Sequence, residues 1–85
     1  MRKSDGPKGG DVVIWSVKGA VPGATSYLVF KVGQTAAPRH YEGTHIWGTV
    51  FSEAKRYAEQ HPVWLREGLG RPWRLIEATP EKHQN

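Results

Sequence analysis

The stretch that decides the fold runs from Thr49 to Pro62 and reads TVFSEAKRYAEQHP. One side of it is apolar when its residues are placed on a helix, and that side holds Val50, Phe51, Ala54, Tyr57, Ala58 and His61. The other side is charged or polar, a pattern typical of an amphipathic helix packed against a core. Ser52 is a suitable N-cap and Pro62 disfavours helical backbone at the preceding residue, so we predict a helix between them. A helix of about ten residues does not persist alone in water and must pack against the strands on either side.

The composition fits one small domain. The chain has 85 residues, and its four tryptophans are expected to supply much of a limited core. It contains no cysteine, which excludes disulfides and thiolate metal sites. No apolar run approaches the roughly 20 residues of a membrane helix, and no secretory signal follows the first basic residues. We therefore expect a cytoplasmic protein without a membrane partner.

The net charge of +4 is divided unevenly along the chain. Residues 1–10 contain Arg2, Lys3 and Lys8 against Asp5, together with three glycines and a proline. This composition predicts a flexible basic tail, which either contacts phosphates or is simply solvated. We expect a single α+β domain over residues 11–79 and a frayed C-terminus over residues 80–85. The body of the domain is then only mildly basic.

Four segments have the composition of strands, and they are residues 11–18, 26–32, 45–50 and 73–78. Residues 33–44 show no periodicity and are interpreted as a long loop. Residues 62–72 are interpreted as a short helical turn or an irregular ordered loop. The resulting order, β-β-β-α-β, predicts a two-layer α+β domain: a mostly antiparallel sheet of about four strands with one main helix packed on one face.

The first two predicted strands are apolar on both faces. The face assigned to the helix carries Val13, Trp15, Val17, Leu28, Phe30 and Val32. The other face carries Val12, Ile14, Tyr27 and Val29 beside Lys18 and Lys31. One helix covers only one face, so the second face predicts another layer. That layer is a second copy of the chain, a different protein, or the looped segments of this one.

Residues 64–74 alternate tryptophan with arginine, a composition found both at protein interfaces and at sites that stack single-stranded nucleic acid. The alternative is that the tryptophans belong to the core and the arginines face solvent. The predicted partner-binding residues are Tyr27, Val29, Trp64, Arg66, Arg71, Trp73 and Arg74. The alternative, a nucleic-acid surface, consists of Lys18, Lys31, Arg66, Arg71 and Arg74.

His40, Glu42 and His45 form the densest polar cluster. If they converged, they could bind Zn²⁺ with water as the fourth ligand. His40 and Glu42 share a face only if the segment is extended, and His45 then points away. The alternative is a polar loop with a surface histidine, followed by a histidine that starts a strand. No motif assigns a reaction, so we expect neither a cofactor nor an enzymatic activity, and a ligand or metal site here is the third hypothesis.

In size, in its lack of motifs and in its one-helix layout, the chain resembles the short proteins carried by phages, integron cassettes and other mobile elements. This resemblance concerns general character and implies no site residues. Our leading hypothesis is a small non-enzymatic interaction module, an accessory protein of a mobile genetic element. It would bind a protein partner or itself through the exposed sheet face and the segment Trp64–Arg74.

Overall fold

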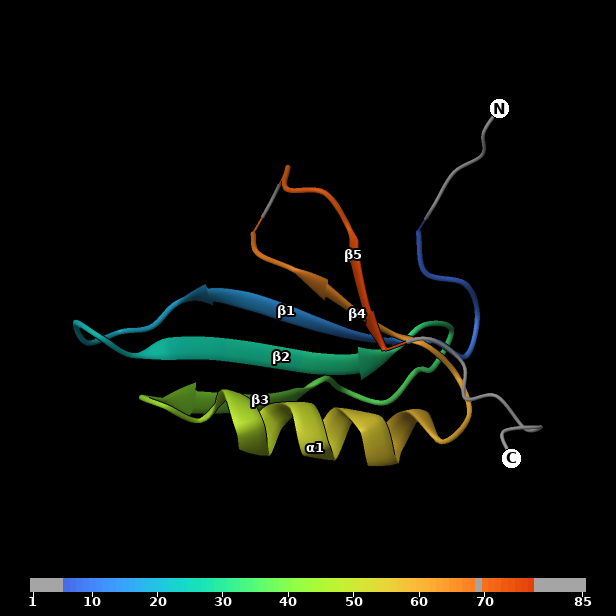
Figure 1. The fold of residues 1–85 in the computed structure, drawn as a ribbon, viewed down its shortest axis with the longest axis horizontal. Helices are drawn as coiled ribbons and strands as arrows, with labels where there is room; N and C mark the ends of the chain where they lie inside the picture. Colours follow the sequence, from blue (N-terminus) through green and yellow to red (C-terminus); the bar gives the residue numbers. More distant parts are fainter. Residues whose placement is uncertain (1–5, 69, 78–85) are drawn as a thin grey trace.

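A computed structural model describes residues 6–68 and 70–77 (Figure 1). Within these residues the chain forms five strands and one helix. In chain order they are β1 (Val12–Lys18), β2 (Thr25–Lys31), β3 (Arg39–Gly43), α1 (Trp47–Ala58), β4 (Val63–Arg66) and β5 (Arg74–Glu77). The predicted frayed C-terminus and the first half of the predicted tail lie outside the described residues.

The five described strands form one mixed sheet in the order β3-β2-β1-β4-β5. β1, β2 and β3 are joined as antiparallel neighbours, and β4 pairs antiparallel with β5. β4 runs parallel to β1, because α1 carries the chain from the β3 edge back across one face of the sheet (Figure 1). The predicted two-layer α+β architecture is confirmed, with five strands instead of about four and one parallel pair.

The third strand and the helix both begin earlier than predicted. The strand occupies Arg39–Gly43, inside the predicted loop, while the last part of the predicted strand 45–50 is the first turn of α1. β3 pairs with β2 along its whole length, and an edge strand with one exposed side needs few apolar residues to form. The helix has no side-chain cap at its N-terminus. Instead, Trp47 stacks on Phe51 with ring centroids 5.4 Å apart, so packing replaces the expected cap at Ser52.

β4 is a strand, so the prediction of a helical turn or a loop after Pro62 was wrong there. Val63 and Leu65 are buried and lie opposite Val12 and Ile14 of the parallel partner β1. Four residues are too short a run to reveal their alternation in the sequence, and the pairing with β1 decides their conformation. β5 lies inside the predicted last strand, which is confirmed for the described residues.

The helix covers the opposite face from the one we predicted. The core beneath it consists of Val12, Ile14, Val29, Val50, Ala54, Ala58, Val63 and Leu65. The small Ala54 and Ala58 let α1 approach the sheet closely, which suits the β-branched residues of β1. The bulkier Trp15 and Phe30, on alternate positions, therefore point to the other side.

Candidate functional site

The face of the sheet that points away from α1 is called the open face here. It is formed by the residues that alternate with the core positions: Val13, Trp15, Val17, Ser26, Leu28, Phe30, His40, Glu42, Trp64, Arg66 and Leu75. The register places Trp15 opposite Leu28 on one side and Arg66 on the other. Leu28 in turn lies opposite His40, so one row of side chains crosses four strands.

One end of the open face is covered by the chain itself. A Cβ atom on Gly6 would lie 3.4 Å from Cδ1 of Trp73, so the backbone before β1 rests against that indole. The indole N–H of Trp64 donates to Asp11 at 3.0 Å, and the amide of Gly10 donates to Val32 at 3.0 Å. Residues 6–10, expected to belong to a flexible tail, therefore contact the body of the domain.

The rest of the open face carries exposed apolar side chains. The exposed fractions are 43% for Val17, 37% for Leu28 and 51% for Leu75. These positions come from three strands, β1, β2 and β5, and not from one loop. Val17 lies opposite Ser26, two residues before Leu28, so these two side chains are diagonal neighbours on one face. Neighbouring exposed apolar side chains are a feature of interaction surfaces, whereas single exposed apolar residues are common on any protein.

Arg66 lies between two indoles on this face. Its guanidinium carbon is 5.4 Å from the ring centroid of Trp15 and 4.7 Å from that of Trp73. Its Nε donates to the carbonyl of Arg71 at 3.0 Å, which fixes the orientation of the side chain. A guanidinium held in this way has lost much of its rotamer freedom before any partner binds, which favours binding.

A polar cluster lies at the β3 edge of the same face. Ser26 Oγ is 2.6 Å from Nε2 of His40, and Oε1 of Glu42 is 3.8 Å from that same nitrogen. The other carboxylate oxygen of Glu42 accepts a hydrogen bond of 2.8 Å from the amide of Ala20. The Ser26–His40 distance suits a nucleophile and its base, but Glu42 approaches the nitrogen that faces the serine and does not orient the ring from Nδ1. The cluster therefore lacks the third member of a catalytic triad.

The structure does not bring the three predicted metal ligands together. His40 and Glu42 share a face because β3 is extended, while His45 lies in the turn before α1 with a φ of 55°. Among residues 6–68 and 70–77, no group of three His, Cys, Asp or Glu side chains is arranged to hold a metal ion. Ser26, which lies against His40, was missed in the sequence because the pairing of β2 with β3 was not predicted.

The predicted partner-binding residues divide between the two faces. Trp64, Arg66 and Trp73 belong to the open face or its border. Val29 is only 1% exposed and lies in the core under α1, so its prediction as a surface residue was wrong. Tyr27 is on the same side, with its ring centroid 5.8 Å from that of Trp47. Both residues lie on the helix side because α1 covers the other face from the one predicted, and the partner-binding role of the half-buried Tyr27 stays a prediction.

Arg71 and Arg74 complete the predicted set. Arg71 is exposed in the connection before β5, where its carbonyl holds Arg66. Arg74 forms a salt bridge of 3.2 Å with Glu67, and it lines a hollow on the helix side that also includes Tyr27 and Trp47. Neither guanidinium extends the Trp15–Arg66–Trp73 cluster.

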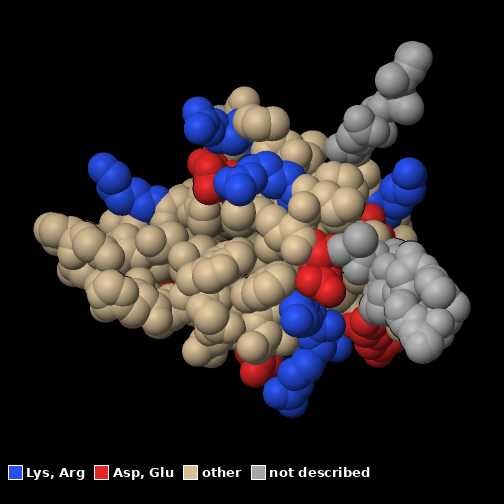
Figure 2. All heavy atoms as spheres, in the orientation of Figure 1, with Lys and Arg blue, Asp and Glu red and all other residues tan. Residues whose placement is uncertain are grey.

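The predicted nucleic-acid residues are also divided. Lys31 lies on the helix side, with its amine 4.8 Å from the ring centroid of Tyr57, whereas Arg66 lies on the open face. Figure 2 shows Lys and Arg atoms in several separate groups, with uncharged residues between them. Because Lys31 and Arg66 lie on opposite faces of the sheet, the five predicted basic residues do not form one continuous surface.

Comparison of the chain with protein-family models, with curated proteins and with solved structures gives no match. In the described part of the chain, no helix combines the length and the apolar character needed to cross a membrane.

Proposed function

We propose that this protein is a non-enzymatic interaction module whose open face binds a second copy of the same chain. The observation that supports this proposal is the exposure of Val17, Leu28 and Leu75 on one side of a rigid sheet whose other side is covered by α1. Burial of these side chains against an equivalent surface would remove apolar area from water, which favours association.

The charge of the open face favours a copy of itself over a strongly charged partner. Apart from His40, its titratable side chains are Arg66 and Glu42, which carry opposite charges and lie on the non-adjacent strands β4 and β3. Both are already engaged, Arg66 by two indoles and Glu42 by the amide of Ala20. Two such faces can approach each other without a net like-charge repulsion.

The size of the face predicts a weak dimer. Strand spacings of about 4.8 Å and rises of about 3.3 Å per residue give these short strands a face on the order of 400 Å² in projection. Because side chains protrude from the sheet, the accessible area of the face is larger than this projected area. It remains near or below the ~800 Å² that each partner buries in a standard interface. We therefore expect association with a Kd in the micromolar range and a packing of sheet on sheet.

Sedimentation or light scattering at increasing protein concentration tests this proposal. The mass should rise from that of a monomer to that of a dimer between about 10 μM and about 1 mM. Val17→Lys and Leu28→Lys should each hold the protein monomeric over this range. Val21→Lys is the matched control, because Val21 is 57% exposed but lies outside the sheet, in the β1–β2 connection.

Three outcomes would contradict the proposal. A wild-type chain that is monomeric at the highest concentration has no self-association to explain. A dimer that persists in both open-face variants uses another surface. A monomer whose open face binds only a different protein keeps the interaction module but excludes the second copy.

A second candidate function, binding of single-stranded nucleic acid, is supported by the Trp15–Arg66–Trp73 cluster alone. Indoles beside an arginine can stack a base and contact its phosphate. Fluorescence anisotropy with a labelled single strand at low salt tests it, with Trp15→Ala as the variant. Binding that is absent at low salt excludes this function. The accessory role in a mobile element and the cytoplasmic location remain predictions.

A further inference from the structure

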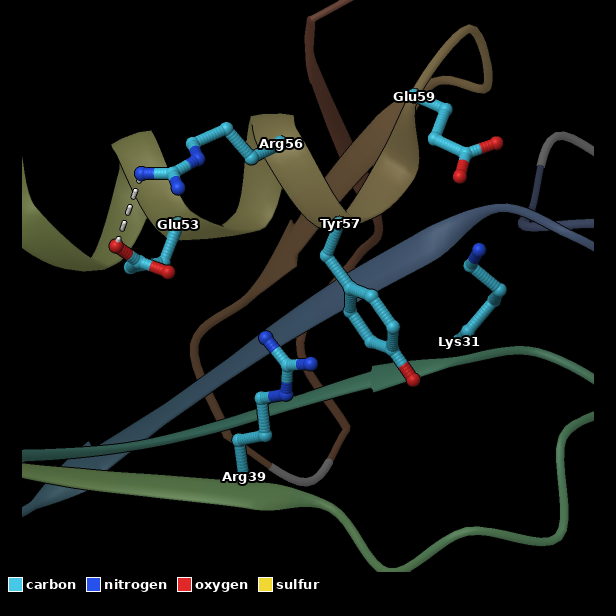
Figure 3. Close-up of a pocket in the computed structure, with 6 residues that line it drawn as sticks. All are labelled: Lys31, Arg39, Glu53, Arg56, Tyr57 and Glu59. Atoms are coloured by element: carbon cyan, nitrogen blue, oxygen red, sulfur yellow. Dashed lines mark ion pairs between the residues drawn. The ribbon is translucent and has the colours of Figure 1, made fainter.

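A second concave surface lies on the helix side, between the C-terminal half of α1 and strands β2 and β3. It has a volume of about 320 Å³ and is lined by Lys31, Arg39, Glu53, Arg56, Tyr57 and Glu59 (Figure 3). The hollow is distinct from the open face, since its side chains come from α1, from Glu59 directly after it, and from strand positions on the side that α1 covers.

Two cations share one aromatic ring at the base of this hollow. The guanidinium carbon of Arg39 is 4.2 Å from the ring centroid of Tyr57, and the amine of Lys31 is 4.8 Å from it. Figure 3 shows the ring between the two side chains. The two charges are therefore no farther apart than the sum of those distances. A ring quadrupole attracts a cation but does not neutralise its charge.

Neither cation has a carboxylate partner in the described part of the chain. The salt bridges found there involve His40, Arg56, His61 and Arg74, and not Lys31 or Arg39. Glu53 is occupied by Arg56 at 3.7 Å. Glu59 lines the hollow without a salt bridge within the described residues. The base of the hollow thus combines two unneutralised positive charges with one unengaged carboxylate at its border.

We propose that this hollow binds a phosphate monoester through Lys31, Arg39 and the hydroxyl of Tyr57. Both cations end long side chains that lie against one ring and line one hollow, so both can turn toward an anion that sits at the edge of the ring. A phosphate monoester has three strong acceptor oxygens, one for each donor group: the guanidinium, the amine and the phenol. Its charge near −2 at neutral pH balances the two cations. A carboxylate offers two oxygens and half of the charge.

The acidic side chains select the kind of phosphate. A phosphodiester chain would bring further phosphates toward Glu53 and Glu59, and these like charges repel. A monoester carries its charge at one end, so its single phosphate can lie at Lys31 and Arg39 while the rest of the molecule points away from both carboxylates. The site therefore favours a single terminal phosphate over a nucleic-acid backbone.

Titration followed by ¹H–¹⁵N NMR at constant ionic strength tests this site. Inorganic phosphate, phosphoserine and adenosine monophosphate are the monoester probes, and acetate and a single-stranded oligonucleotide are the contrasting ones. The monoesters should shift the amides around Tyr57, Arg39 and Lys31, with Kd values on the order of millimolar at such an exposed site. Acetate and the oligonucleotide should bind this hollow more weakly than phosphoserine.

Three variants and one control separate specific binding from general attraction. Arg39→Met and Lys31→Met should each weaken phosphoserine binding by about fivefold, the effect of losing one charge-assisted contact at an exposed site. Glu59→Gln should strengthen it by about twofold, because a repelling charge is removed. Lys18→Met is the control, since Lys18 is exposed at the far end of β1 and does not line the hollow.

Several results would overturn the proposal. One is the absence of shifts around Tyr57 with any monoester. Another is a loss of affinity in Lys18→Met as large as in Lys31→Met, which would indicate general charge attraction. Tighter binding of the oligonucleotide at these amides would assign the hollow to nucleic acid. Circular dichroism of each variant checks the fold, and Glu59→Gln remains informative if Arg39→Met unfolds, because Glu59 is exposed after the helix end.

Discussion

The indole nitrogen of Trp64 donates a hydrogen bond of 3.0 Å to Oδ2 of Asp11, a residue 53 positions earlier in the chain. Asp11 is 5% exposed, and among the described residues it is the buried charged side chain. The same oxygen accepts the amide of Lys8 at 3.0 Å, and Nδ1 of His61 lies 3.6 Å from the other oxygen. One carboxylate thus joins the segment before β1, the start of β1 and strand β4.

Removal of this carboxylate should destabilise the domain. Asp11→Ala leaves the Trp64 indole and the Lys8 amide without their acceptor, and we expect a loss of about 2 kcal/mol in the free energy of unfolding. Asp11→Asn keeps one acceptor oxygen and should lose about half as much. Urea unfolding measures both. In a double-mutant cycle with Trp64→Phe, a coupling near zero would show that the hydrogen bond does not stabilise the fold.

The assignment of the two sheet faces is tested by one pair of valines on the same strand. Val12 is completely buried under α1, whereas Val17 on the open face is 43% exposed. Val12→Ala should cost about 2 kcal/mol, because it removes buried methyl groups and leaves a cavity. Val17→Ala in the monomer should cost less than about 0.5 kcal/mol. Equal losses in thermal or urea unfolding would contradict the arrangement of helix and sheet.

Gly48 tests where the helix begins. It lies in the first turn of α1, and a Cβ at this position would meet no atom within 4 Å. Gly48→Ala should therefore raise the free energy of unfolding by about 0.5 kcal/mol, since alanine loses less backbone entropy in a helix. Thermal unfolding measures the change. A decrease in stability would place Gly48 in a strand, as the sequence alone predicted.

Gly10 and Gly33 form a matched pair with left-handed backbone. Their φ angles are +94° and +89°, but a Cβ on Gly10 would lie 2.6 Å from Cε1 of His61 while a Cβ on Gly33 would meet nothing within 4 Å. Gly33→Ala should cost about 1 kcal/mol through backbone strain alone. Gly10→Ala should cost about 2 kcal/mol, because the His61 ring must also move. If the two losses in urea unfolding are equal, the His61 ring moves away from residue 10 without a cost in stability.

Local patterns predicted several elements because their signal lies within a few residues. β1 and β2 have β-branched and aromatic composition, and α1 has a sustained helical period around Ala54 and Ala58. The predictions failed where the deciding partner is distant in sequence. β4 is only four residues long and is fixed by its parallel pairing with β1, and β3 is fixed by its pairing with β2.

The same distinction applies to the candidate sites. The sequence identified Trp64, Arg66 and Trp73 as an unusual cluster, but the contribution of Trp15 depends on the register of β1 against β4. Likewise, Arg39 and Lys31 are unremarkable basic residues until β2 and β3 bring both against Tyr57 of α1. Ser26 reaches His40 for the same reason.

The sequence by itself determined that one amphipathic helix packs on a sheet that is apolar on both sides, because alternation and helical periodicity are local properties of the chain. Only the tertiary structure decided which side the helix covers. Val12 and Val13 are equally apolar neighbours, and both are completely buried. The small alanines of α1 and the parallel strand β4 place Val12 in the core under the helix, and this choice leaves Val17, Leu28 and the Trp15–Arg66–Trp73 cluster on the open face.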